Sequence, residues 1–174
     1  MRQGLDERHL AAWQSFLRAH AELMVRLEDE LVAAGHPPLA WYDVLVNLSH
    51  APERRMRMSE LARSTAFSRS GLTRLVDRME VAGLVTRQAC PTDRRGAFCV
   101  LTDAGFAALE AAWPVHAGGV DRHFAAHLDA ADADTLTEAF RRIVAALCPA
   151  GGPGGGGEGA LPEERAEATA QAGT

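Results

Sequence analysis

The sequence predicts a mostly α-helical (α+β) fold in which a series of helices is interrupted by one short β-hairpin. Two observations predict it. Between residues 6 and 147, apolar residues recur mostly at spacings of three and four, which is the period of an amphipathic helix. Residues 84–101 differ, because two short segments with β-branched residues flank a turn-forming run. With 47% hydrophobic and 24% charged residues, the 174-residue chain has the composition of a globular protein.

The first 49 residues predict two helices. Residues 6–34 have one apolar face and form a long first helix that stops at Gly35. That face carries Leu10, Trp13, Leu17, Met24, Leu27 and Leu31. After Pro37 and Pro38, residues 39–49 are apolar on most sides and predict a second helix that is mostly buried.

Two shorter helices are predicted after a basic loop at residues 51–57. The third helix spans residues 59–65, and Ser68 is a suitable N-cap for a fourth helix that ends before Gly83. The fourth helix has a buried stripe of Leu72, Leu75, Val76 and Met79. Because the connection between these two helices is so short, they form a helix-turn-helix.

A β-hairpin follows directly. Residues 84–88 and 96–101 predict its strands, and Pro91 to Arg95 predict its turn. A hairpin in this position after a helix-turn-helix is a wing. The central part of the chain, residues 39–101, is therefore expected to be a winged helix-turn-helix lobe.

Two further helices are predicted, and with the first they form a dimerisation lobe. Thr102 and Asp103 begin a long helix that reaches about Leu128, and residues 136–147 contain the apolar stripe of a last helix. Residues 1–38 and 102–148 have more apolar surface than the small lobe needs for cover. A second copy of the chain would cover it, which predicts a homodimer. Residues 149–174 are a Gly/Pro-rich tail that we expect to be disordered.

Basic residues are concentrated in the predicted winged lobe. Residues 54–95 contain ten arginines and four acidic residues, in a chain whose net charge is −5. Arginines gain affinity for a polyanion by displacing the counterions condensed on its phosphates. The charge pattern therefore predicts a surface that binds double-stranded DNA.

The fourth helix and the wing supply the candidate DNA contacts. A helix that binds in the major groove needs two kinds of side chain on its outward face. Short polar side chains bond to bases or phosphates, and arginines bond to guanine. The helix candidates are Ser68, Arg69, Ser70, Thr73, Arg74 and Arg78. At the wing, Arg94 and Arg95 are candidates for the minor groove, and Asp93 either orients one of them through an ion pair or is the first residue of a type I turn. Any soluble amphipathic helix has a polar outer face, but the adjacent hairpin favours DNA.

These residues also resemble a known family. The run MSELARSTAFSRSGLTRLVDRMEVAGLVTRQACPTDRRGAFCVLTDAG, residues 58–105, is similar to the winged core of the MarR family of bacterial transcription regulators. The matching pieces are SELA, LTRLVDRME with GLV, DRRG and LTDAG, in that order. The resemblance implies a homodimer that binds pseudo-palindromic operators, usually as a repressor released by a small ligand or an oxidant.

The resemblance also implies an effector site between the dimerisation helices and the winged lobe. Trp13, His20, Trp41 and Tyr42 are the candidates for its lining, and aromatic rings with polar tips suit a planar, anionic phenolic compound such as a phenolic acid. The alternative is that the two tryptophans only pack in the core.

A metal- or oxidant-responsive regulator of the same fold is an alternative. His123 and His127 are spaced as two ligands on one helix would be, with His116 nearby, but no cysteine or glutamate is placed to complete a zinc site. Cys90 and Cys99 could be oxidised, although neither stands near the first helix, where the family's sensing cysteine would be. We expect no bound metal and no cofactor.

Other functional classes are less consistent with the sequence. We find no GxSxG, HExxH or GxxxxGK motif and expect no enzyme. A winged-helix protein-interaction module would have lost the outward arginines, which are present. The N-terminus has acidic residues where a secretory signal would be apolar, and no run is long enough to span a membrane, so we expect a cytoplasmic protein with no membrane partner.

Overall fold

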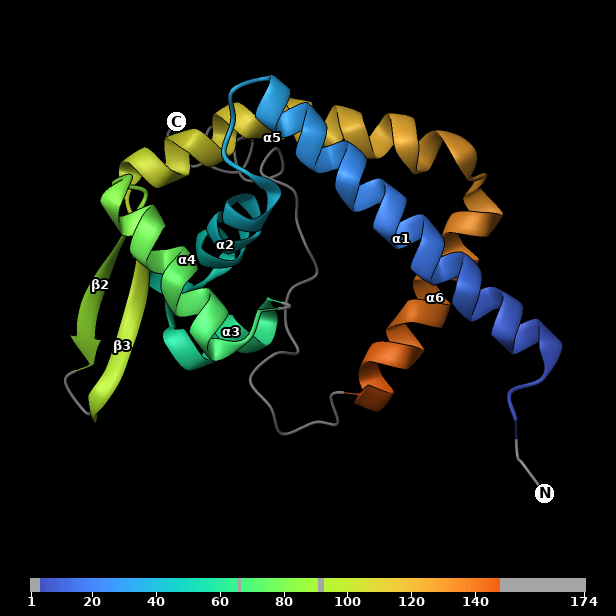
Figure 1. Ribbon diagram of the computed structural model, residues 1–174, viewed down its shortest axis with the longest axis horizontal. Helices are drawn as coiled ribbons and strands as arrows, with labels where there is room; N and C mark the ends of the chain where they lie inside the picture. Colours follow the sequence, from blue (N-terminus) through green and yellow to red (C-terminus); the bar gives the residue numbers. More distant parts are fainter. Residues whose placement is uncertain (1–3, 66, 91–92, 148–174) are drawn as a thin grey trace, which may run out of the picture.

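The elements form two groups (Figure 1). Helices α2, α3 and α4 and a three-stranded sheet form a small lobe, and α1, α5 and α6 are arranged beside it as a long-helix lobe. The computed structural model describes residues 4–65, 67–90 and 93–147, with the backbone alone for residues 93–95. The tail predicted at residues 149–174 lies outside the described residues, as does Cys148.

Helix α1 (Glu7–Ala33) is covered along only part of its length. Asp6 is its N-cap and accepts a hydrogen bond from the His9 backbone N–H at 2.9 Å. Leu27 and Leu31 are buried, whereas Leu10, Trp13 and Leu17, which the periodicity assigns to the same face, are 42%, 52% and 46% exposed. The first half of this apolar face is therefore only partly covered within the described part of the chain.

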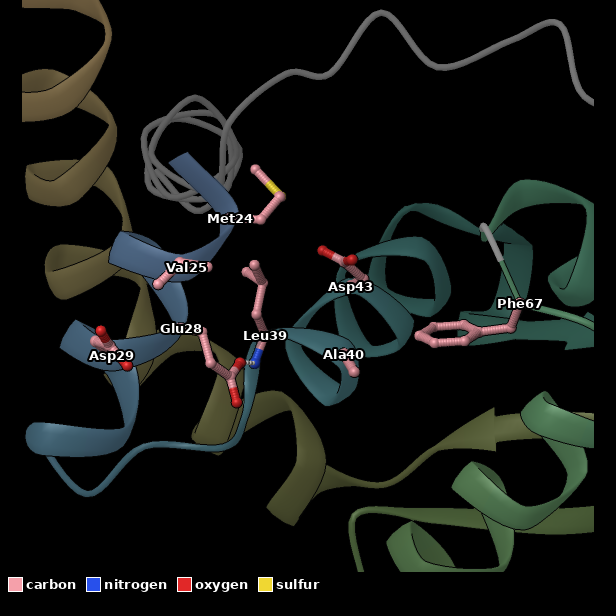
Figure 2. Close-up of a pocket in the computed structure, with 8 residues that line it drawn as sticks. All are labelled: Met24, Val25, Glu28, Asp29, Leu39, Ala40, Asp43 and Phe67. Carbon is pink, nitrogen blue, oxygen red and sulfur yellow. Dashed lines mark hydrogen bonds between the residues drawn. The ribbon is translucent and has the colours of Figure 1, made fainter. Parts of the chain in front are cut away.

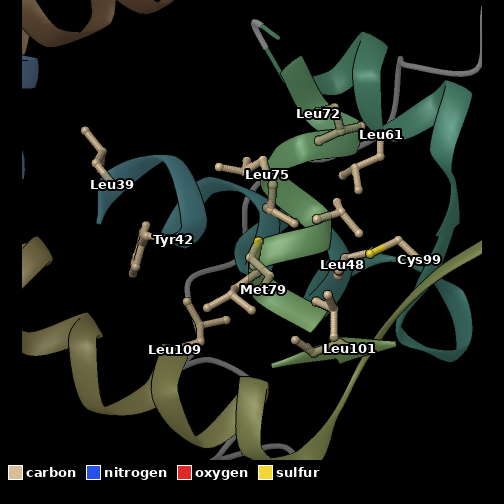
Figure 3. Close-up of a cluster of buried hydrophobic side chains, with 14 of the residues drawn as sticks. Leu39, Tyr42, Leu48, Leu61, Leu72, Leu75, Met79, Cys99, Leu101 and Leu109 are labelled. Carbon is tan, nitrogen blue, oxygen red and sulfur yellow. The ribbon is translucent and has the colours of Figure 1, made fainter. Parts of the chain in front are cut away.

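The small lobe contains the predicted helix-turn-helix. Helix α2 (Leu39–His50) packs against α3 (Met58–Ser64) and α4 (Arg69–Val81), and Figure 3 shows their side chains meeting in one core. Ser68 is the N-cap of α4, as predicted: its Oγ accepts from the Gly71 N–H at 3.1 Å. The predicted stripe of α4 is at most 4% exposed, so the opposite side of this helix must face outward.

Three strands form an antiparallel sheet in the order β1-β3-β2. Strand β1 (Arg55–Arg57) corrects the expectation of a loop at residues 51–57. It pairs with β3 (Asp93–Leu101), and the guanidinium groups of Arg55 and Arg57 lie over the Phe98 ring. Strand β2 (Val85–Cys90) completes the wing. Both hairpin strands extend further toward the tip than predicted. Strand β2 continues to Cys90, and β3 begins at Asp93, inside the segment expected to be a turn.

Helix α5 (Asp103–His123) begins with Thr102 as its N-cap, as predicted, but ends before the expected Leu128. The backbone leaves the helix at Phe124, and a 3-10 turn follows. Helix α6 (Ala130–Leu147) then starts with its own cap, in which Asp129 Oδ1 accepts from the Asp132 N–H at 2.8 Å. Because α6 has its own start signal, the chain turns earlier than the apolar periodicity predicts.

Candidate nucleic-acid interface

The outward face of α4 carries the polar side chains predicted from the sequence. Ser68, Arg69, Ser70, Thr73, Arg74 and Arg78 are all exposed. The Thr73 hydroxyl donates to the Arg69 carbonyl oxygen at 2.9 Å, so in this conformation it can only accept from a base. Ser68 has its Oγ in the N-cap bond and 3.3 Å from the Ser70 Oγ. The arginines of this face are thus its main outward donors.

Unlike the exposed arginines of α4, Arg87 on β2 points its guanidinium toward α4 and bonds to it. Its Nη1 lies 2.7 Å from Asp77 Oδ1 and 3.0 Å from Glu80 Oε2, and its Nη2 donates to the Thr73 carbonyl oxygen at 3.1 Å. The Arg87 backbone N–H also donates to Glu80 Oε1 at 2.9 Å. Sequence reasoning counted Arg87 only as part of the basic run and missed these contacts, which depend on how β2 packs against α4.

Three further arginines of the basic run have partners inside the protein. Arg54 lies 3.9 Å above the Phe106 ring centroid and 3.6 Å from Asp103 Oδ1, and Arg55 pairs with Glu53 at 2.7 Å. Arg57 also lies over an aromatic ring, at 5.3 Å. The basic run is therefore not one uniform DNA-facing surface, and the exposed arginines of α4 are the more available ones.

A hollow of about 310 Å³ lies where α3, α4 and β3 meet. Its lining combines small, hydroxyl and arginine side chains with one methionine: Arg57, Met58, Ser59, Arg69, Thr73, Gly96 and Ala97. Ser59 and Arg57 were not predicted as site residues, because neither lies on the helix expected to read DNA. The hollow places two more polar groups beside α4.

The wing candidates can be placed only along the backbone. Asp93, Arg94 and Arg95 begin β3, next to the tip of the hairpin. Their side chains lie outside the described residues, so the minor-groove contact and the Asp93 ion pair stay predictions.

A cavity of about 480 Å³ lies between α1, α2 and the loop before α4 (Figure 2). Apolar side chains and three carboxylates line it: Met24, Val25, Glu28, Asp29, Leu39, Ala40, Asp43 and Phe67. Glu28 Oε2 accepts from the Leu39 N–H at 2.6 Å, and burial raises the pKa of Asp43. The cavity is thus lined by residues of both the long-helix lobe and the small lobe.

None of the four predicted effector residues lines this cavity. Trp13 is exposed near Phe16, and His20 is also exposed on α1. Trp41 packs against the core, and Tyr42 is buried, with its ring 4.4 Å from that of His116. The structure therefore does not bring these four side chains together.

The histidine and cysteine candidates have structural surroundings. His123 Nε2 lies 2.7 Å from Glu30 Oε1, and this hydrogen bond, with a second from Arg122, lowers the pKa of Glu30. Since α5 ends at His123, His127 is not one turn further along the same helix, which corrects the predicted spacing. Among the described residues no group of three potential ligands could hold a metal ion.

Cys99 is fully buried, and burial raises the pKa of its thiol to about 12. It is therefore a thiol rather than a reactive thiolate at neutral pH. Cys90 is buried as well. This environment is unfavourable for an oxidant sensor at these two positions.

The exposed polar face of α4, its N-cap and the adjacent hairpin define a winged helix-turn-helix protein. The model of the MarR family matches residues 37–96. The solved structure of AbsC, a MarR family transcriptional regulator from Streptomyces coelicolor, is 38% identical with a TM-score of 0.75, over 83% of this chain and 97% of that chain. Sco3205 from the same organism, a MarR family regulator solved in complex with DNA, is 32% identical with a TM-score of 0.77, over 87% and 95%.

A curated relative gives the same result. The HTH-type transcriptional regulator MhqR of Bacillus subtilis (strain 168) is 24% identical over 139 residues, which are 80% of this chain and 93% of MhqR. This chain belongs to the MarR family of transcriptional regulators. In the part of the chain that the structure describes, no helix is long and apolar enough to cross a membrane.

Proposed function

We propose that this MarR-family regulator is a homodimeric repressor that binds a pseudo-palindromic DNA operator. In this proposal α4 enters the major groove, and the wing reaches the neighbouring minor groove. The observation that carries it is the exposed polar face of α4, where Arg69, Arg74 and Arg78 point away from a fully buried apolar stripe. Arginine in this position can make bidentate contacts with guanine.

The test is selection of duplexes from a random library with the purified protein. The dissociation constant of the selected duplex and of a scrambled duplex of equal composition is then measured between about 50 and 200 mM salt. We expect tighter binding of the selected duplex by roughly 1,000-fold or more, and weaker binding of both as salt rises. Equal affinity for the two duplexes would exclude sequence-specific recognition. Increased transcription from a promoter carrying the selected sequence, after deletion of the gene, would support repression.

The homodimer is supported by apolar surface on the long helices. Phe16 of α1 and Phe140 of α6 have ring centroids 5.6 Å apart, and next to them Ile143 and Val144 are 52% and 58% exposed. Several exposed apolar side chains close together are typical of an interface. A second copy of the chain would cover them, and would place two α4 helices for two half-sites about one DNA turn apart.

Oligomeric state tests this part of the proposal. Ile143→Glu places a charge in the proposed interface and should shift the sedimenting species from dimer to monomer at micromolar concentration, because an unpaired charge is costly to bury. Val81→Glu is the matched control, since Val81 is 91% exposed at the end of α4, outside the proposed interface. A wild-type monomer, or an Ile143→Glu dimer as tight as wild type, would contradict the homodimer.

We further propose that a small ligand acts at the cavity between α1 and α2. Its three carboxylates come from Glu28, Asp29 and Asp43, and its described lining contains no lysine or arginine. These charges favour a neutral or cationic compound over the phenolic acid suggested by the aromatic residues. Phe67, which lies in the loop before α4, lines the cavity, so a ligand bound there would contact this loop. Benzylamine and benzoate form a matched pair of probes: stabilisation in a thermal melt by benzylamine alone would support the proposal, and stabilisation by benzoate alone would contradict it.

A further inference from the structure

We propose that Arg87 is a positioning residue for DNA recognition, which fixes α4 against the wing and offsets part of the charge of the two carboxylates of α4 without touching DNA. The inference rests on the proposed function of α4 as the DNA-reading helix. It assigns a role to an arginine that lies in the middle of the basic run but faces the protein.

The contacts of Arg87 reach three successive turns of α4. Its guanidinium meets the Thr73 carbonyl, Asp77 and Glu80 within 3.1 Å. These residues are four and three positions apart and therefore lie along one side of the helix. A planar guanidinium has several N–H groups in a fixed arrangement and can bridge such partners, whereas an ammonium group is a single charged point. Arg87 thereby fixes the rotation of α4 relative to β2.

The exposure of these side chains agrees with this role. The Arg87 side chain is 27% exposed, and Asp77 and Glu80 are 55% and 37% exposed. Both Nη atoms of Arg87 bond to α4, which leaves few of its donors for a phosphate. Arg74 and Arg78 on the same helix are exposed and lie on its outward side.

The charge of the two acids explains why an arginine is needed here. Helix α4 carries Asp77 and Glu80 between and beside the arginines that would contact DNA. An unpaired carboxylate at the edge of a DNA-reading surface repels the phosphates, and a low-dielectric interface strengthens that repulsion. Arg87 pairs with both acids, so the cost of carrying them on α4 is offset within the protein. The positive charge of Arg74 and Arg78 then acts on DNA.

A double-mutant cycle with the selected duplex as probe tests the inference. Arg87→Met keeps most of the apolar stem and removes the charge. We expect about tenfold weaker binding at low salt, and the loss should shrink as salt rises, because salt screens the repulsion between the unpaired carboxylates and the phosphates. Adding Asp77→Asn removes one of the carboxylates that Arg87 pairs with, so Arg87→Met/Asp77→Asn should regain most of the affinity. A purely structural role predicts no such recovery, because the double variant has no ion pair to restore. Arg26→Met on α1 is the control and should bind like wild type.

The possible results separate the alternatives. Affinity of Arg87→Met equal to wild type would overturn the inference while leaving the proposed function intact. A salt slope reduced by about one unit, without recovery in the double variant, would mean that Arg87 contacts a phosphate directly, which also overturns it. If Arg87→Met fails to fold, Arg87→Lys serves instead: it keeps the charge but cannot bridge all three partners, and it should bind with intermediate affinity. A wild-type protein that binds no duplex would refute the proposed function, and this inference with it.

Discussion

Replacing Gly105 by alanine should destabilise the protein, because the first turn of α5 packs directly on the backbone that leads into the wing. A Cβ at this position would overlap the Leu84 carbonyl oxygen and lie 2.8 Å from Leu101 Cδ1. The same turn is fixed by Thr102, whose Oγ1 accepts from the Gly105 N–H at 3.0 Å and lies 2.7 Å from the Gly83 carbonyl oxygen. The helix cannot move to make room for the methyl group without losing this cap.

The magnitude follows from three contributions. Overpacking against a backbone carbonyl costs about 1–3 kcal/mol, and disturbing the Thr102 cap costs about 1 kcal/mol. The better helix propensity of alanine offsets at most about 1 kcal/mol. We therefore expect Gly105→Ala to lower the free energy of unfolding by about 2 kcal/mol.

Urea unfolding at one fixed protein concentration measures this, since dimerisation would make stability depend on concentration. Gly118→Ala in the same helix is the matched control: its Cβ would meet only the end of the flexible Arg122 side chain, at 3.1 Å. Its expected effect is a gain of up to about 1 kcal/mol. A Gly105→Ala variant as stable as wild type would refute the tight-packing argument.

Three further predictions concern single side chains. Arg74→Ala should weaken binding of the selected duplex by about 1–3 kcal/mol and affect a scrambled duplex less, whereas equal losses would exclude base reading. Arg94→Ala or Arg95→Ala should lower the salt slope of DNA binding by about one unit, and an unchanged slope would remove the wing from the interface. Burial lowers the pKa of His116, and its buried Nδ1 has no hydrogen-bond partner among the residues that the structure describes. The unfolded chain therefore takes up this proton first, and stability should fall as pH drops below about 6.5. His116→Phe should abolish that part of the pH dependence and add about 1 kcal/mol in urea unfolding at pH 8, and a loss of stability there would contradict the reasoning.

Local signals in the sequence were sufficient for the helices of the small lobe. The Ser68 cap, the stripe from Leu72 to Met79 and the glycine after α4 act within one or two helical turns, and the structure confirms each of them. The outward position of Arg74 and Arg78 follows from the same periodicity. Such features depend on neighbours in the chain, which is why a single sequence predicts them.

Features that depend on distant residues were not predicted. Strand β1 has no β-branched residue, and it forms because Met56 pairs with Cys99, far along the chain. The contacts of Arg87 depend on the packing of β2 against α4, so the basic run alone could not indicate that its guanidinium bonds to α4. The helical periodicity places Leu27 and Trp13 on one face, but it could not indicate that Leu27 is buried within its own chain whereas Trp13 is 52% exposed.

The junction between the wing and the long helices has a mechanical consequence. Strand β3 ends at Leu101 and α5 begins at Asp103, so Thr102 alone separates them, and its hydroxyl donates to the carbonyl oxygen of Gly83, just after α4. A linker of one anchored residue cannot absorb a change in the tilt of α5. In a pair of protomers, the distance between the two α4 helices would therefore depend on the angle at which the long helices cross. A small change in that angle would change this distance, so that the two α4 helices would no longer match the spacing of successive major grooves.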